Sequence, residues 1–256
     1  MKIIVCVKQV PAKDAPLHID AASGWIRETD ISFEMNEPDS YALEEALRLK
    51  EKHGGEVVAL SMGPDRVKQT IKEALAKGAE RGIHITDDKF HSLDPLATAR
   101  SLAAAIAKEK PDLVLTGLQS DDHGFGQTAP LLAEILGLPH ATIIMQIEVH
   151  DGKMRLKREL EAGWFQWMEC PLPGVLSIQS GINKVRYATL KGIMAAKKKE
   201  IAAVTRESLG VAAEPTQRVE KLYVPQKTKK TEFLTGQPKE VAAQLVEKLK
   251  HEARVL

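Results

Sequence analysis

Short apolar runs alternate with amphipathic helical segments over the first half of the chain, and this alternation restricts the fold more than any other feature. Four runs have the length of a buried strand, and helical spacing of apolar residues recurs between them. The runs are 2–10, 57–60, 82–86 and 113–115. Strands that alternate with helices through short links build a parallel sheet with helices on both faces. The sequence therefore predicts an α/β domain with a doubly wound, mostly parallel sheet.

The stretch 112–127 joins one of these strands to a helix through a polar loop that contains Gly124 and Gly126. The helical pattern opens at Thr128 and ends at Gly137. Free backbone N–H groups at a helix N-terminus favour an anion, and a phosphate suits such a loop. Glycine-rich turns are also common in ordinary α/β domains, so the loop alone leaves both interpretations open.

The expected strand order brings this loop close to three other segments. Ligands of open parallel sheets bind beyond the carboxyl ends of the strands, where the strand order reverses. With the strands in the order third, second, first, fourth, fifth, the run 2–10 lies beside the run 113–115. We therefore expect residues 6–10, the helix start at Asn36, the turn 61–63 and the polar loop to share one crevice.

After Gly137 the pattern changes to strand-like runs with little helix between them, which predicts antiparallel strands added at the sheet edge. The runs are 141–149, 153–160, 163–169 and 174–178. The third run contains Trp164, Phe165 and Trp167, although aromatic residues make up only 4% of the chain. Packing within this protein and a partner surface are both compatible with them, and their alternation favours packing.

The last part of the chain has no independent core from Arg186 onward. An extended stretch rich in Lys, Thr, Pro and Gln runs to about Thr235, and an amphipathic helix follows at 239–256. The apolar stripe of that helix indicates an extended C-terminal arm that embraces another subunit, although a disordered tail folded back on its own domain is the alternative. We therefore divide the chain into a nucleotide-binding domain at 1–185 and a partner-recognition segment at 186–256.

Composition and residue spacing argue against several classes of function. The net charge is +1, so the overall balance of basic and acidic residues does not indicate nucleic acid binding. Cys6 and Cys170 form neither a metal-ligand spacing nor a disulfide framework, and His84 and His91 have no acidic or Cys partners at metal spacing. No run approaches the length of a membrane span and the chain starts as a strand, which predicts a cytoplasmic protein.

The helix expected after Asn36 carries three acidic residues that could be mistaken for a catalytic group. Asp39 is interpreted as a helix cap. Glu44 and Glu45 are adjacent and so point in different directions on a helix, which favours a solvated face over a shared substrate atom. We expect no catalytic residue in this chain.

Six motifs match one known family. They are VCVKQV at 5–10, MNEPDSYALEEALRLKEK at 35–52, ALSMGP at 59–64, AKGAERGIHI at 76–85, DLVLTGLQ at 112–119 and RYATLKGIMAAKKKEI at 186–201. Together they resemble the β subunit of electron-transfer flavoproteins from Met1 to about Gly210, and the last motif is the most specific. The resemblance implies an adenine nucleotide alpha hydrolase-like fold.

The resemblance also implies a function. Such a β subunit forms a heterodimer with an α subunit that holds the redox FAD. The complex accepts electrons from dehydrogenases, such as the acyl-CoA dehydrogenases of fatty acid oxidation, and passes them to a membrane quinone oxidoreductase. The β crevice holds AMP or, in electron-bifurcating members, a second FAD. Neither nucleic acid binding nor direct membrane insertion is implied.

Matching positions imply individual roles for residues of this chain. Leu190 matches the apolar residue that docks into partner dehydrogenases, and Ile193, Lys197 and Lys198 lie beside it. Nucleotide contacts are implied for Cys6, Asn36, Met62, Asp122, His123, Gly124, Phe125, Gly126, Gln127 and Thr128.

Two details of the crevice leave other interpretations open. The loop 122–129 lacks the run of acidic residues common in the family, so AMP and a second FAD both remain alternatives; Thr128 after Gln127 is similar to the AMP-holding members. A stand-alone nucleotide-binding domain at 1–185 is a further alternative. A nucleotide-cleaving enzyme of a related fold would need a glycine-rich loop where this chain has 8–11.

Overall fold

The computed structural model describes residues 1–87, 93–212, 214–226 and 231–256. Contacts divide the chain into two compact units, Met1–Lys221 and Leu222–Leu256. Residues 186–221, which the sequence analysis assigned to the partner-recognition segment, therefore belong to the first unit. The second unit contains helix α6 (Pro238–Glu247) and a further helical turn at Lys248–Glu252.

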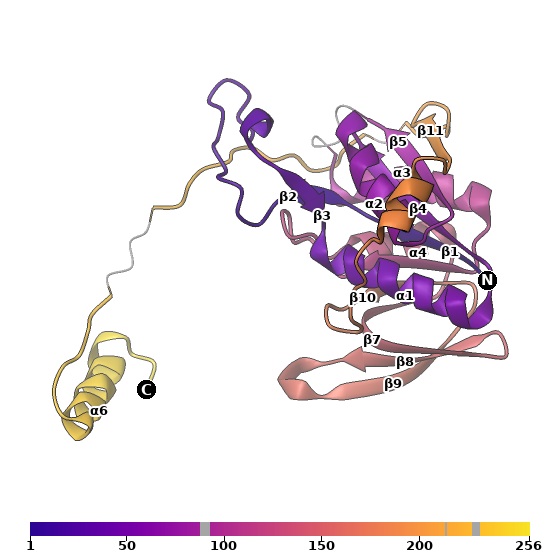
Figure 1. The fold of residues 1–256 in the computed structure, drawn as a ribbon. Helices are drawn as coiled ribbons and strands as arrows, with labels where there is room; N and C mark the ends of the chain where they lie inside the picture. The colour runs from indigo at the N-terminus through magenta and orange to yellow at the C-terminus, as the bar shows by residue number, and fades with distance from the viewer. Residues whose placement is uncertain (88–92, 213, 227–230) are drawn as a thin grey trace. The chain divides into compact units, whose positions relative to one another are not determined.

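A nine-stranded sheet forms the centre of the first unit, in the order β11-β5-β4-β1-β6-β10-β7-β8-β9 (Figure 1). The strands are β1 (Lys2–Cys6), β4 (Glu56–Gly63), β5 (Arg81–Thr86), β6 (Leu113–Gly117), β7 (His140–His150), β8 (Lys153–Glu159), β9 (Phe165–Pro171), β10 (Gly174–Ile178) and β11 (Ile201–Thr205). Neighbours from β11 to β7 are parallel, whereas β8 and β9 are antiparallel. The predicted fold class is confirmed, and so is the predicted neighbourhood of β1 and β6.

Helices cover both faces of the sheet because successive strand residues point to opposite sides. Ile3 and Val5 of β1 pack into one core together with α1 and α2, whereas Ile4 and Cys6 pack into a second core with α3 and α4. A fully buried Leu or Ile contributes roughly 1.5 to 3 kcal/mol to such a core. The helices of the unit are α1 (Glu37–His53), α2 (Lys68–Lys77), α3 (Pro95–Glu109), α4 (Thr128–Leu136) and α5 (Leu190–Ala196), with short 3-10 turns at Glu28–Asp30, Asp65–Val67 and Glu161–Gly163.

Two strand predictions were wrong in detail. The run 174–178 forms β10, which is parallel and lies between β6 and β7 instead of adding an antiparallel strand at the edge. All five of its residues are buried, and such a continuous buried run is typical of a central parallel strand. The run 2–10 is also divided, because β2 (Gln9–Pro11) leaves the large sheet and pairs with β3 (Phe33–Met35).

The aromatic residues near β9 are exposed, so the prediction that they pack within the protein was wrong. Trp164 is 73% exposed, and Phe165 and Trp167 are also exposed. Their partners are cations of the neighbouring strand: the Arg155 guanidinium lies 4.3 Å from the Trp167 ring centre, and the Lys157 ammonium lies 4.0 Å from that of Phe165. Both are cation–π contacts.

The histidines considered as metal ligands have different outcomes. His84 is buried, and its Nε2 lies 2.9 Å from the carbonyl oxygen of Gly63. His91 lies outside the described residues. Within the described ranges, no group of three or more His, Cys, Asp and Glu side chains is arranged to hold a metal ion. In the same ranges, no helix combines the length and apolar character that crossing a membrane requires.

Candidate functional site

A cavity of about 150 Å³ lies beyond the carboxyl ends of β1, β4 and β6. Each strand end contributes to its wall, through Cys6, Ser61 and Thr116. Helix α3 and the loop between β6 and α4 complete the wall. This is the edge of the sheet where the order of the strands reverses, the usual place for a ligand in a doubly wound fold.

The structure brings most of the predicted nucleotide contacts to this cavity. The predicted residues that line it are Cys6, Asn36, Met62, His123, Phe125, Gly126 and Thr128. The predicted residues outside the lining are Asp122, Gly124 and Gln127, although all three belong to the same loop. Contact with a nucleotide stays a prediction for all ten.

Two glycines and a helix start without a side-chain cap lie where the loop meets α4. Gly124 and Gly126 have φ of +65° and +63°, a conformation that glycine adopts without the strain of a side chain. Helix α4 begins at Thr128, and the preceding Gln127 makes no capping hydrogen bond through its side chain. The first N–H groups of a helix have no partner within the helix and attract an anion.

Asn36 holds the loop in place from the start of α1. Its Nδ2 donates to the carbonyl oxygen of Gln119 at 3.0 Å, and its Oδ1 accepts from the backbone N–H of Asp121 at 2.9 Å. Both polar atoms of this buried side chain are therefore used on the loop. Asn36 shapes the cavity wall by fixing residues far away in the sequence.

Asp39 has a role that the sequence analysis missed, because it does not cap α1. Its Oδ2 accepts from the backbone N–H of Lys8 at 2.7 Å, and its Oδ1 accepts from that of Gly117 at 2.9 Å. The carboxylate thus joins the ends of β1 and β6 at the cavity. Burial raises the pKa of Asp39 to about 6, although both N–H groups favour its charged form.

Asp94 is a second buried carboxylate that the sequence analysis missed. Its Oδ1 caps α3 through the backbone N–H of Ala97 at 2.7 Å. Its Oδ2 accepts from the backbone N–H groups of Thr216 at 2.6 Å and Gln217 at 2.9 Å. Burial alone would raise the pKa of Asp94, but these hydrogen bonds lower it to about 2. The residue therefore attaches the segment around Thr216 to the cavity wall.

An aromatic cluster connects the long loop after β2 to the cavity. The ring centres of Trp25 and His123 are 6.2 Å apart, and those of His123 and Phe125 are 5.6 Å apart, both in edge-to-face geometry. Burial and the nearby charge of Lys8 lower the pKa of His123. Ile19 and Ile26 form an antiparallel bridge within the long loop.

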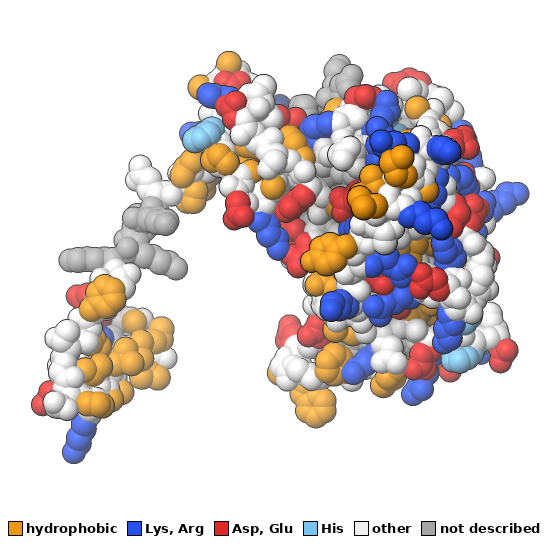
Figure 2. All heavy atoms as spheres, viewed as in Figure 1, with side chains coloured by type: hydrophobic (Ala, Val, Ile, Leu, Met, Phe, Trp, Pro, Cys, Tyr) orange, Lys and Arg blue, Asp and Glu red, His pale blue; other side chains and the backbone are white. Residues whose placement is uncertain are grey.

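A second candidate surface lies over α5. Figure 2 shows apolar side chains surrounded by basic ones in this region. Leu190 is 83% exposed, and Ile193, Lys197 and Lys198 are exposed beside it. Lys199 differs, because its ammonium donates to the carbonyl oxygens of Leu75 and Ala79 at the end of α2. Because of this exposure, Leu190 is not part of the hydrophobic core of the first unit.

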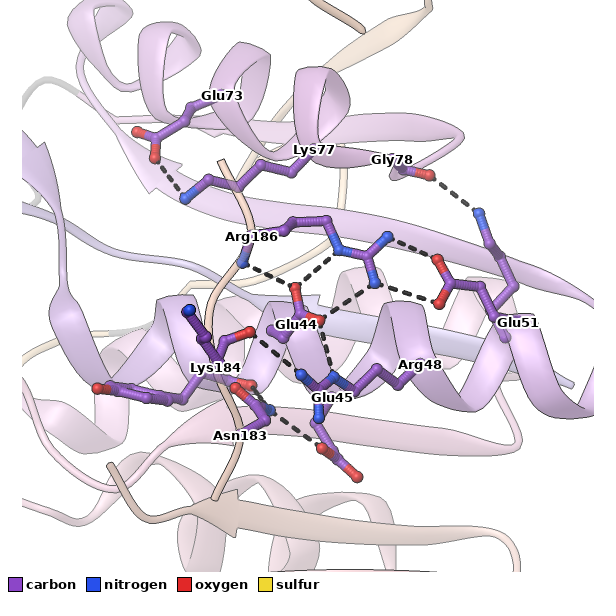
Figure 3. A network of polar contacts seen from close by, with 12 residues as sticks. Glu44, Glu45, Arg48, Glu51, Glu73, Lys77, Gly78, Asn183, Lys184 and Arg186 are labelled. Carbon is purple, nitrogen blue, oxygen red and sulfur yellow. Dashed lines mark hydrogen bonds and ion pairs between the residues drawn. The ribbon is translucent and has the colours of Figure 1, made fainter. Parts of the chain in front are cut away.

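The segment that leads to α5 is fixed by ion pairs on α1, and Figure 3 shows Arg186 lying between Glu44 and Glu51. Arg186 Nε and Nη2 donate to the two oxygens of Glu44 at 2.8 and 3.1 Å, and Nη1 donates to Glu51 at 2.6 Å. Arg48 Nε also donates to Glu44 at 2.8 Å.

The prediction of a solvated face was wrong for Glu44, which is 3% exposed. Burial would raise the pKa of this carboxyl, but the hydrogen bonds of Arg186 and Arg48 lower it. Glu45 is half-buried and accepts from Asn183 Nδ2 at 3.0 Å. Both acidic residues therefore hold the segment before α5, and Glu45 does so while partly exposed.

Known proteins that are similar to this chain identify its family. The family model of the electron transfer flavoprotein domain matches residues 23–209. The chain is 38% identical to the electron transfer flavoprotein subunit beta of Methylophilus methylotrophus, over 96% of this chain and 97% of the relative. The chain belongs to the electron transfer flavoprotein family. The resemblance that the motifs indicated is confirmed.

Other members of the family are similar over the full length. The subunit beta of Clostridium acetobutylicum is 35% identical, over 98% of this chain and 99% of the relative. The mitochondrial subunit beta of Oryza sativa subsp. japonica is 36% identical, over the whole of both chains. Similarity to these electron transfer flavoprotein subunits thus includes the second unit, which lies beyond the matched domain.

Proposed function

We propose that this chain is the β subunit of a heterodimeric electron-transfer flavoprotein. In this role it accepts electrons from a dehydrogenase, such as an acyl-CoA dehydrogenase, for delivery to a membrane quinone oxidoreductase. The redox FAD is held mainly by the α subunit, and this chain supplies no catalytic residue. The observation that carries the proposal is full-length similarity to subunits named beta, in a chain whose cavity is lined by the loop between β6 and α4.

AMP is the nucleotide that we assign to the cavity. The apolar side chains of Leu60, Met62 and Leu102, together with Cys6, line one part of the cavity and suit an adenine ring. The N-terminus of α4 and its glycine-containing loop suit a single phosphate group. A second FAD in the same cavity, as in electron-bifurcating members, is the alternative function.

We assign residues 186–256 to contacts with partner proteins. Leu190 and Ile193 form an exposed apolar anchor beside Lys197 and Lys198, which suits a transient interface with an acidic dehydrogenase. In the second unit, Leu245 and Val246 of α6 are 47% and 51% exposed. This apolar surface supports the proposal that the C-terminal arm embraces the α subunit. We assign the complex to the cytoplasm.

Co-purification tests the proposal as a whole. Expressed with its α subunit, the tagged chain should yield a one-to-one complex that contains FAD and AMP, while the chain alone should be colourless. Mass spectrometry of the released nucleotide separates AMP from a second FAD. Tight stoichiometric flavin on the isolated chain, with turnover of a substrate, would refute the proposal.

Substitution of Gly126 by valine should lower the AMP content of the complex about tenfold. A β-branched residue is strained at a φ of +63°, and the loop must rearrange to relieve a cost of roughly 1 to 2 kcal/mol. Gly152→Val is the matched control, because Gly152 has φ of +75° in the turn between β7 and β8. Full nucleotide content in Gly126→Val would mean that the phosphate site is elsewhere.

Substitution of Leu190 by alanine should weaken binding of the partner dehydrogenase by ~1 to 3 kcal/mol, the range for a truncated hot spot. The melting temperature and nucleotide content should not change, since Leu190 is exposed. Leu160→Ala, another exposed leucine, is the control. The measurement is electron transfer at varied concentration of the complex. Unchanged transfer in Leu190→Ala would remove α5 from the docking surface.

A further inference from the structure

Lys8 is the one positively charged side chain among the described residues that line the cavity. Its ammonium lies 2.6 Å and 2.8 Å from the two carboxylate oxygens of Asp122, and 3.3 Å from the hydroxyl of Ser120. The Lys8 and Asp122 side chains are 32% and 22% exposed, so the pair is partly shielded from water. The Lys8 ammonium, which could bind a phosphate, is therefore already paired with Asp122.

The loop fixes the position of this ion pair. The backbone N–H of His123 donates to Asp122 Oδ1 at 2.8 Å and holds the carboxylate toward the ammonium. Burial would raise the pKa of Asp122, but the attraction and hydrogen bond of Lys8 and the hydroxyl of Ser120 lower it. Asp122 stays charged, and Lys8 stays paired, at neutral pH.

The other charges at the cavity are negative. Asp39 and Asp94 both line it, and their carboxyl groups already accept backbone N–H groups. Among the described lining residues, the N-terminus of α4 is available to one phosphate group. No unpaired cation among them is available to a second phosphate group. Each added phosphate brings more negative charge, which carboxylates repel and only a cation or a metal ion neutralises.

We propose that Asp122 limits the cavity to nucleotides with a single phosphate group, because it holds the Lys8 ammonium away from a second phosphate. The inference rests on the proposed nucleotide site and adds the residue that discriminates between a nucleoside monophosphate and a nucleoside diphosphate. In this arrangement Asp122 is a specificity-determining residue that acts through Lys8.

Binding of AMP and ADP to the complex of this chain with its α subunit tests the inference. The complex is freed of nucleotide, and both dissociation constants are measured by isothermal titration calorimetry without divalent metal. The wild-type complex should bind AMP at least tenfold more tightly than ADP. In Asp122→Asn the ammonium is released, and ADP binding should strengthen about tenfold relative to AMP binding, the gain that a charge-assisted hydrogen bond to the second phosphate supplies.

Two further variants separate this mechanism from a general change of charge. Asp121→Asn removes one negative charge from the neighbouring position, whose side chain accepts from the backbone N–H of Glu37 instead of from Lys8. It should leave the ratio of the two dissociation constants within twofold of wild type. In the double variant Lys8→Met Asp122→Asn the gain for ADP should disappear, because the gain depends on the ammonium.

The outcomes are distinguishable. Suppose that the wild-type complex binds AMP, but Asp122→Asn leaves the ratio of the AMP and ADP dissociation constants unchanged, or Asp121→Asn changes that ratio equally. Either result overturns the role of Asp122 but keeps the nucleotide site. Wild-type complex that binds ADP as tightly as AMP also overturns it. If the wild-type complex binds no AMP, although removal of nucleotide has left its circular dichroism unchanged, the nucleotide site and the inference are both overturned.

Discussion

Replacement of Gly117 by alanine is expected to lower the free energy of unfolding by about 3 kcal/mol, near the upper end of the usual cost of overpacking. A Cβ atom at Gly117 would lie 2.4 Å from Asp39 Oδ1 and 2.7 Å from both Asp39 N and the carbonyl carbon of Pro38. Two of these atoms are backbone at the start of α1, so no side-chain rotation relieves the overlap. Denaturation in urea measures the effect.

Gly152→Ala is the control for this prediction. Gly152 has φ of +75°, and a Cβ there would meet no atom within 4 Å. Its cost is therefore conformational alone, about 1 kcal/mol. If the two variants lose equal stability, the contact between β6 and α1 is looser than the distances indicate. Loss of AMP from Gly117→Ala is expected as well, because the displaced Asp39 borders the cavity.

Replacement of Arg186 by methionine is the second large effect, an expected loss of about 2 to 4 kcal/mol of unfolding free energy. Removing one partner from a buried ion pair leaves the other charge uncompensated, which costs about 3 to 5 kcal/mol when both groups are buried. Glu44 is buried, but the Arg186 side chain is 32% exposed, so solvent screening lowers the estimate. The Glu44 carboxylate would keep two hydrogen bonds, from Arg48 and from the backbone N–H of position 186.

A surface pair provides the comparison for Arg186→Met. Arg27 and Asp30 are 3.4 Å apart and more than half exposed, so Arg27→Met should cost about 0 to 1 kcal/mol. The double variant Glu44→Leu Arg186→Met should be more stable than the sum of the single effects, because no buried charge is left alone. Additive losses would show that Glu44 and Arg186 do not stabilise each other.

The order of β5, β4, β1 and β6 and the position of the crevice could be predicted from the sequence because they depend on local patterns. The apolar run 113–115 and the glycines of the following loop are visible without tertiary information. A parallel sheet then leaves few topologies, and each places the ends of β1, β4 and β6 together. The family motifs lie on these same elements.

The buried carboxylates could not be assigned in this way. Asp39 occupies the third position after Asn36, a place typical of a helix cap, and its N–H donor at Gly117 is 78 positions away. Glu44 and its neighbour Glu45 have the composition of a solvated face, but Arg186 arrives 142 positions later and covers Glu44. Whether a carboxylate is buried depends on distant partners, which a local pattern does not contain.

The exposed aromatic residues of β9 show a related limit. Alternation of large apolar and polar residues predicts a strand, and β9 is one. It does not predict whether another element covers the outer face. β9 ends the described sheet, and Trp164 and Trp167 remain exposed there. Burial of a strand face is decided by the order of strands, which the pattern within one strand does not encode.

Helix α1 supports both the cavity and the segment that leads to α5. Asp39 in its first turn holds the strand ends, and Glu44, five positions later, holds Arg186. About 7.5 Å of helix axis separates these two attachments, a length over which an α-helix is stiff. If a nucleotide occupies the cavity as proposed, it stabilises α1 without taking part in redox chemistry. Through α1 it also fixes the position of α5, the proposed docking surface.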